Sequence, residues 1–134
     1  MASLLKVDSL TGVTTAGSIS VTGEGNSTTT NLQQGLTKQW CALNGTGTIA
    51  ILDSFNVSSV VDGGTGTYGF VCTSNFSSIN HTPTGEVLAV GNFSSIDLSS
   101  EPETTGTDSF RCFNIGGTGI DSAFVSYQSC GDLA

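Results

Sequence analysis

Glycine-rich turns recur at short intervals along most of this chain, and they constrain its fold more than any other feature. They fall at 44–47, 62–66, 82–85 and 116–119, with a further turn around Pro102. Asn44-Gly45 and Asp62-Gly63 are dipeptides that favour tight hairpins between strands. Turns this closely spaced leave room for short strands but not for long helices.

The segments between the turns alternate apolar and polar residues, which is the period of a β-strand with one buried face. The strand candidates are residues 40–43, 48–52, 55–61, 67–73, 86–92, 108–115 and 122–128. Good helix formers are scarce, because Ser, Thr and Gly together supply 56 of the 134 residues. We therefore predict an all-β fold, an antiparallel β-sandwich of jelly-roll-like type, with residues 94–107 as a long surface loop.

The N-terminal segment differs from the rest of the chain. Residues 1–37 carry isolated large apolar residues among Ser, Thr and Gly, and they contain no aromatic residue. Such a segment cannot bury a core by itself and gains stability most readily by pairing with copies of itself. We predict that residues 1–37 form an extended anchoring and trimerisation segment and that residues 38–134 form the β-sandwich head. Residues 31–38 are expected to be a linker with one helical turn, capped by Asn31.

The charge balance excludes two classes of partner. Three basic residues, Lys6, Lys38 and Arg111, stand against eleven acidic ones, and the formal net charge is −8. Nucleic acids and anionic lipid surfaces both require a basic footprint. No apolar run approaches the roughly 20 residues of a membrane-spanning helix. We therefore expect neither nucleic-acid binding nor membrane insertion.

The four cysteines, Cys41, Cys72, Cys112 and Cys130, form no Cys-x-x-Cys pair, and the chain has a single histidine, so a zinc site is not expected. An even count permits two disulfides in any of three pairings. The first three cysteines lie in apolar, strand-like runs, where a free thiol behaves as a small buried hydrophobe. The first residues lack the basic start and long apolar stretch of an export signal, so we favour free thiols. Cys130 is expected to be the most accessible.

No group of residues matches a catalytic, cofactor-binding or metal-ligating motif, so we expect no enzymatic activity, no cofactor and no metal. His81 stands alone beside Pro83, and we expect it to be an exposed loop side chain. The aspartates fall at strand ends or in loops, where solvated acids keep a protein soluble.

Four acids are close enough in sequence to attempt a carboxylate pair: Asp97, Glu101, Glu103 and Asp108. The loop that carries them is rich in Ser, Thr and Pro, and it would hold them too loosely for catalysis. Trp40 and the seven Phe residues could line a sugar-binding groove, but at strand spacing we expect most of them in the core. Phe76 and Phe93 are the expected exceptions, because they lie in turns rich in Ser and Asn.

Several sequence runs resemble structural proteins of marine tailed bacteriophages that infect cyanobacteria and other ocean bacteria. The resemblance covers residues 4–72. It rests on Leu4-Leu5-Lys6-Val7-Asp8, Lys38-Gln39-Trp40, Asn44-Gly45-Thr46-Gly47-Thr48-Ile49 and Asp62-Gly63-Gly64-Thr65-Gly66-Thr67-Tyr68. The similar proteins are tail-fibre, spike or capsid-appendage proteins, and phage fibres are usually homotrimers.

The resemblance implies a non-catalytic virion structural protein: a small trimeric fibre, spike or capsid-decoration subunit. It would be made in the cytoplasm of the bacterial host, reside on the virion exterior, and contact other capsid or tail proteins through its N-terminal segment. The alternative is a host-receptor or carbohydrate-binding tip of a tail fibre, with a host surface glycan as its ligand. Capsid and tail locations both remain open.

Overall fold

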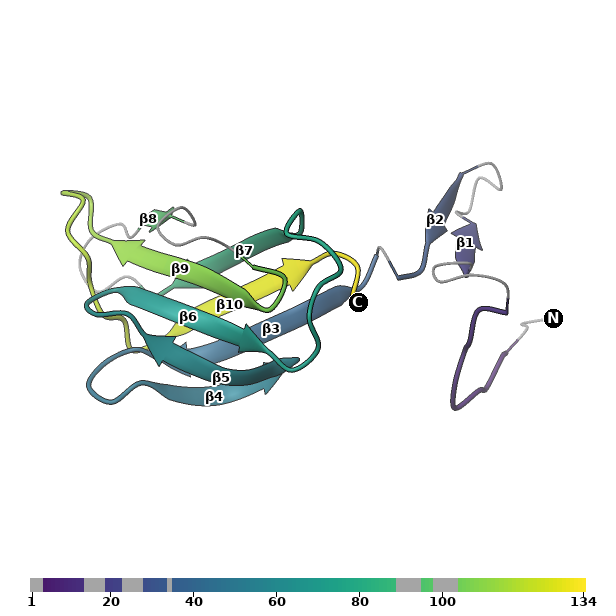
Figure 1. The fold of residues 1–134 in the computed structure, drawn as a ribbon, viewed down its shortest axis with the longest axis horizontal. Helices are drawn as coiled ribbons and strands as arrows, with labels where there is room; N and C mark the ends of the chain where they lie inside the picture. Colours follow the sequence, from purple (N-terminus) through teal and green to yellow (C-terminus); the bar gives the residue numbers. More distant parts are fainter. Residues whose placement is uncertain (1–3, 14–18, 23–27, 34, 89–94, 98–103) are drawn as a thin grey trace. The chain divides into compact units, whose positions relative to one another are not determined.

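The computed structural model describes residues 4–13, 19–22, 28–33, 35–88, 95–97 and 104–134 (Figure 1). The chain forms two compact units, Met1–Leu36 and Thr37–Ala134. The division lies one residue from the boundary between the predicted anchoring segment and the predicted head.

The first unit contains one small hairpin. Strands β1 (Ser20–Thr22) and β2 (Thr29–Asn31) pair antiparallel, with Val21 opposite Thr30. After β2 the chain turns, and the Asn31 side chain accepts a hydrogen bond from the Gln33 backbone N–H at 2.8 Å. This is the turn that Asn31 was predicted to cap, and no helix follows it among the described residues.

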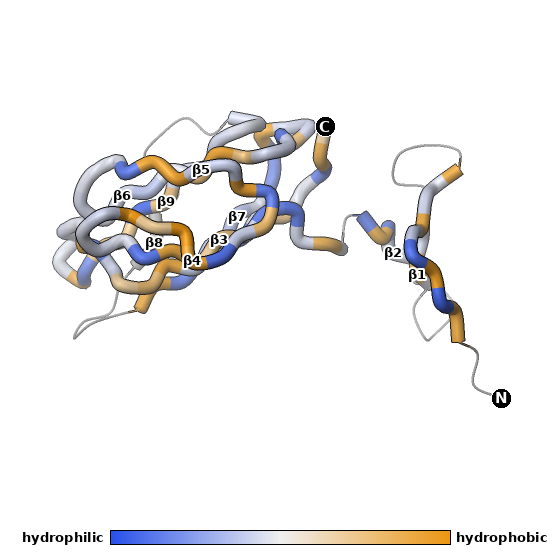
Figure 2. Tube along the Cα trace, turned by 90° about the horizontal axis from the view of Figure 1, so that it is seen from below, coloured by the Kyte–Doolittle hydropathy of each residue, from blue (hydrophilic) through white to orange (hydrophobic). Residues whose placement is uncertain are grey.

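Apolar side chains of the first unit remain in contact with solvent. Leu4, Leu5 and Val13 are 78%, 79% and 96% exposed. Figure 2 shows the apolar residues of this unit alternating with hydrophilic ones along the trace. A hairpin of two three-residue strands is marginally stable at best in water, so the hairpin described in this unit contributes little stability by itself.

The second unit is a sandwich of two antiparallel sheets. One sheet has the order β4 (Ala50–Phe55), β3 (Thr37–Asn44), β10 (Val125–Cys130) and β7 (Thr82–Val87). The other has the order β5 (Val57–Asp62), β6 (Thr67–Cys72), β9 (Thr107–Phe113) and β8 (Ser95–Asp97). The two sheets lie face to face in Figure 1. The predicted all-β sandwich is therefore confirmed.

The core lies between the sheets and follows from the period-two pattern of the central strands. Alternate residues of β3, β6, β9 and β10 point inward, and they are buried as a set: Cys41, Leu43, Tyr68, Phe70, Phe110, Cys112, Val125 and Tyr127. The rings of Phe70 and Tyr127 are stacked, with centroids 4.3 Å apart. Phe110 meets both of them edge-on.

The turn between β5 and β6 requires glycine at residue 66. The Asp62 side chain accepts a hydrogen bond from the Gly64 N–H, and Gly66 adopts a positive φ of 71°. A Cβ at Gly66 would lie 2.5 Å from the Cys112 carbonyl oxygen, so both the backbone conformation and the available space require glycine.

Several segments differ from their prediction. The strand expected over residues 55–61 is broken at Asn56, which has a φ of 57°, so that Phe55 ends β4 and Val57 begins β5. Residues 82–85, expected to be a turn, belong to β7, and Pro83 is tolerated there because β7 is an edge strand that pairs only with β10. Residues 95–97, expected to lie in a loop, form β8 and pair with β9. The remainder of the expected 94–107 loop is described only from Thr104 onward, where Thr104 and Thr107 form an isolated bridge.

Candidate functional site

The clearest constellation of polar side chains is a buried cluster in the sandwich. Asp108 on β9, Tyr127 on β10 and His81, just before β7, meet inside the core. The Tyr127 hydroxyl donates to one carboxylate oxygen of Asp108, and the Nε2 atom of His81 contacts the other. The side chains of His81 and Asp108 are each 1% exposed. Strands far apart in sequence thus bring the three groups together.

The hydrogen-bonding partners in this cluster favour an ion pair. The Nδ1 atom of His81 lies 3.1 Å from the Ser78 carbonyl oxygen, which can only accept, and Nε2 faces the Asp108 carboxylate. An imidazole that donates from both nitrogens is an imidazolium. Burial raises the pKa of Tyr127 well above its usual range, so its hydroxyl keeps its proton and donates. The cluster therefore has the geometry of a buried ion pair between His81 and Asp108, with the Tyr127 hydroxyl donating to the same carboxylate.

Aromatic rings and the C-terminal residues enclose the ion pair. The Phe76 ring stacks on the His81 ring with centroids 4.2 Å apart. Phe76 also forms a bridge with Leu133, and the Ser77 N–H donates to the Asp132 carbonyl at 2.8 Å. Because the pair is closed off from solvent, a substrate cannot reach it. The pair links the segment before β7 to β9, and Phe76 and Ser77 of the same segment bond to the C-terminal residues.

Two sequence predictions about these residues are wrong. His81 was expected to be exposed, and Asp108 was expected to be a solvated acid near a loop. The residues around Pro83 form a strand rather than a turn, which places His81 at the entry of β7 and against the core. The burial of Asp108 could have been predicted from the sequence. Asp108 lies two residues before Phe110 and four before Cys112, so alternation places all three on the inward face of one strand.

Further polar groups lie buried among the inward-facing positions. Gln39 on β3 is paired in register with Ser129 on β10, and both are fully buried. Gln39 lies beside the Cys72 thiol and Ser129 beside the Tyr127 hydroxyl, but neither makes a hydrogen bond of ordinary geometry with a described residue. Buried groups of this kind usually bind an ordered water molecule.

The cysteines follow the predicted pattern of burial. Cys41, Cys72 and Cys112 are buried in β3, β6 and β9, Cys130 is half-buried at the end of β10, and all four are free thiols. Burial raises the pKa of Cys41 to about 11 and that of Cys112 to about 12, and it also raises the pKa of Cys72. These three thiols stay protonated at neutral pH, whereas the nucleophile in cysteine chemistry is the thiolate.

Native labelling of the full chain with a thiol reagent at pH 8 should therefore modify Cys130 first. Cys41, Cys72 and Cys112 should react only after the protein is unfolded in urea, because their sulfur atoms are both shielded and protonated. Peptide mapping after timed labelling distinguishes the four sites. A non-reduced intact mass lower by four hydrogens, indicating two disulfides, would contradict the free thiols.

The four acids considered as a carboxylate pair do not form a described site. Asp108 is inside the core, and residue 97 pairs with Arg111 across β8 and β9. Glu101 and Glu103 lie outside the described residues. Within the described part of the chain, no three His, Cys, Asp or Glu side chains are grouped so as to hold a metal ion.

The aromatic residues are divided between the core and the surface. Phe70, Phe76 and Phe110 are buried, so the prediction that Phe76 would be an exception is wrong. Phe55 and Phe124, expected in the core, are 50% and 42% exposed. Phe55 is exposed because it lies on the outer side of an edge strand, where strand alternation does not produce burial. Phe93 lies outside the described residues.

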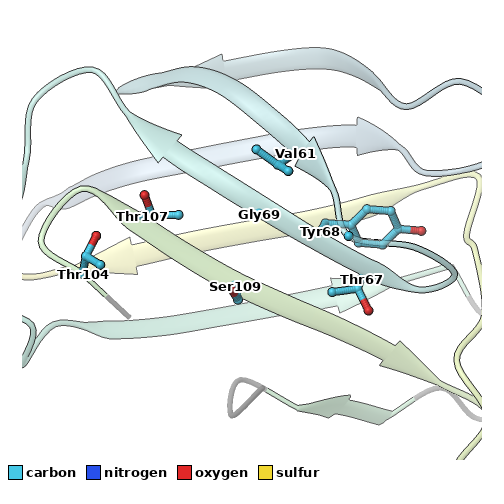
Figure 3. A pocket seen from close by; sticks show the side chains of 8 residues that line it. Val61, Thr67, Tyr68, Gly69, Thr104, Thr107 and Ser109 are labelled. Atoms are coloured by element: carbon cyan, nitrogen blue, oxygen red, sulfur yellow. The ribbon is translucent and has the colours of Figure 1, made fainter. Parts of the chain in front are cut away.

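A shallow hollow lies on the outer surface of each sheet. The hollow on the β5–β6–β9 face has a volume of about 380 Å³, and Val61, Gly69, Thr104, Thr107 and Ser109 line it (Figure 3). Its accessible side chains are hydroxyl-bearing or apolar. Neighbouring Tyr68 contributes no exposed ring, because its side chain is 1% exposed and packs in the core.

The hollow on the β4–β3–β10–β7 face has a volume of about 260 Å³. Thr84, Gly85, Glu86, Ser126 and Gln128 line it, and Gln128 is paired in register with Trp40 on β3. This face combines an indole ring, an amide and a carboxylate in neighbouring positions.

No protein-family model, curated protein or solved structure matches this chain. Among the described residues, no helix is long and apolar enough to cross a membrane.

Proposed function

We propose that this chain is a non-catalytic structural subunit on the exterior of a tailed-phage virion. In this proposal residues 1–36 join three copies and attach them to other virion proteins, and residues 37–134 form the exposed head. The particle would be assembled in the cytoplasm of the bacterial host. The observation that carries the proposal is the small first unit, most of whose described large apolar side chains are exposed.

The exposed residues of that unit support association between chains. Leu4, Leu5, Leu10 and Val13 are each more than half exposed, although leucine and valine are normally buried. Three copies around an axis would cover these side chains and extend the two-stranded hairpin into a larger assembly. Identical copies are the simplest partners, because each chain supplies the same apolar stretch.

The chemistry of the head supports a structural role. Its single histidine is paired with Asp108 inside the core, and its most buried thiols remain protonated. These side chains contribute to packing and hydrogen bonding. The resemblance of residues 4–72 to marine-phage appendage proteins supplies the virion location, either on the capsid or on the tail.

Light scattering of the full-length protein at micromolar concentration should give about three times the chain mass of 13.6 kDa. Replacing Leu4 and Leu5 together by Asp should lower that mass, because charged side chains oppose apolar association. Replacing the exposed Ile115 of the head by Asp is the control and should leave the mass unchanged. A monodisperse monomer of the wild-type chain would contradict the trimer, and electron microscopy of purified particles would test the virion location.

A further inference from the structure

The outer face of the β4–β3–β10–β7 sheet carries a continuous row of side chains across all four strands. Strand pairing places Phe55 opposite Trp40, Trp40 opposite Gln128, and Gln128 opposite Thr84. The inward-facing neighbours on β3 and β10 are buried, so this row points away from the core. We call these four residues the Trp40 row. Neighbouring strands are about 4.8 Å apart, so the row spans about 14 Å.

A second row runs beside the first and is more polar. Asp53 is opposite Ala42, Ala42 is opposite Ser126, and Ser126 is opposite Glu86. The hollow of about 260 Å³ lies where the β10 and β7 ends of the two rows meet. The face thus has rings at the β4–β3 end, and hydroxyl, amide and carboxylate groups at the β10–β7 end.

We propose that this face binds a neutral saccharide, with Trp40 and Phe55 contacting the sugar rings and Gln128, Ser126 and Glu86 bonding to hydroxyl groups. A pyranose ring has C–H groups on its faces and hydroxyl groups around its edge. Aromatic side chains suit the C–H groups of the ring faces, because they offer a broad apolar surface at low conformational cost. Amide, hydroxyl and carboxylate side chains suit the hydroxyl groups of the sugar, because together they both donate and accept hydrogen bonds.

The charge of the face selects among saccharides. Asp53 and Glu86 are both exposed on it, and the whole chain has a net charge of −8. Lys38, which precedes Trp40 on the same side of β3, is buried and makes interactions of its own. Sulfated or uronic-acid sugars would be repelled. The ligand class is therefore a neutral oligosaccharide. The inference does not depend on the trimeric virion role, because one head contains the whole face.

Trp40 is the single tryptophan of the chain, so its fluorescence reports directly on this face. The full-length protein is titrated with neutral trisaccharides of glucose, galactose, mannose and N-acetylglucosamine, and with sulfated and uronic-acid trisaccharides for comparison. At least one neutral trisaccharide should change the tryptophan emission in a saturable way, and the anionic ones should bind at least tenfold more weakly. Calorimetry then gives Kd for the variants, including those without the indole.

Trp40→Ala, Phe55→Ala and Gln128→Ala should each raise Kd at least tenfold. Phe113→Ala is the matched control, because Phe113 is a partly exposed ring on the outer side of the other sheet, and it should leave Kd unchanged. Phe55 and Gln128 are exposed, so their variants remain informative even if Trp40→Ala impairs folding; circular dichroism and melting verify this.

Three results would overturn the proposal: no binding of any neutral trisaccharide at millimolar concentration, equal Kd for wild type and the row variants, or a preference for the anionic sugars. A fall in oligomer mass on Phe55→Ala, without loss of fold, would assign the face to contact between copies of the chain and would also overturn it. Failure of the saccharide test leaves the light-scattering test of trimerisation unaffected.

Discussion

Replacing Asp108 by Leu should lower the free energy of unfolding by about 3–5 kcal/mol, because it leaves both the His81 ring nitrogen and the Tyr127 hydroxyl buried without their carboxylate partner. Tyr127→Phe should cost less, about 1–3 kcal/mol, since it removes one hydrogen bond to a charged acceptor. Urea unfolding monitored by circular dichroism measures both changes, provided that the m-value is unchanged.

A combined variant separates the value of the ion pair from the cost of breaking it. His81→Phe, Asp108→Leu and Tyr127→Phe together should recover most of the stability lost by Asp108→Leu alone, because no buried polar group of the cluster remains unpaired. Phenylalanine at residue 81 can keep the stacking with Phe76. Asp53→Leu on the exposed face of β4 is the control and should change stability by no more than about 0.5 kcal/mol. A loss below about 1 kcal/mol for Asp108→Leu would show that the cluster is not a tightly coupled ion pair.

Deleting residues 1–36 should abolish the proposed trimer and leave a folded, monomeric sandwich. The predicted core is complete without these residues, because every member of the buried hydrophobic cluster lies between Cys41 and Tyr127. Light scattering should give the mass of a single truncated chain, and far-UV circular dichroism should keep a β-sheet spectrum with cooperative melting.

The truncation can fail in two distinguishable ways. An unfolded truncated chain would show that the N-terminal strands belong to the core of the folded protein. A truncated chain that is folded and still trimeric would place the association on the head instead. The Leu4 and Leu5 double variant helps to separate these cases, since it keeps every residue of the chain in place.

The strands of the sandwich could be predicted because local chemistry specifies them. Thr67-Tyr68-Gly69-Phe70-Val71-Cys72 alternates large apolar residues with smaller ones, and β6 has these bounds in the structure. Asn44-Gly45 and Asp62-Gly63 mark the ends of β3 and β5, because few other residues tolerate the backbone of tight turns. Short-range preferences of this kind do not depend on the partner strand.

The bounds of β7 and β8 could not be predicted, since both depend on a partner that only the folded chain provides. Pro83 reads locally as a turn residue, yet β10 supplies the hydrogen-bonding partners of β7 and leaves the proline at the free edge. The residue types at 95–97 give little indication of a strand. They form one because β9 lies next to them in the folded chain and pairs with them.

The polar and ionisable residues likewise have some properties that the sequence determines and others that only the folded structure determines. Composition determined that the chain is acidic and lacks a basic surface, and the apolar runs around three cysteines favoured their burial, because those properties depend only on which residues are present and on their neighbours. Tertiary structure decided the fate of His81, Asp108 and Trp40. His81 and Asp108 are 27 residues apart and became an ion pair when β9 and the entry to β7 met in the core. Trp40 became a surface ring because register placed it on the outer side of its strand, next to Phe55 and Gln128. Pairing across strands sets these distances, and sequence separation carries no information about them.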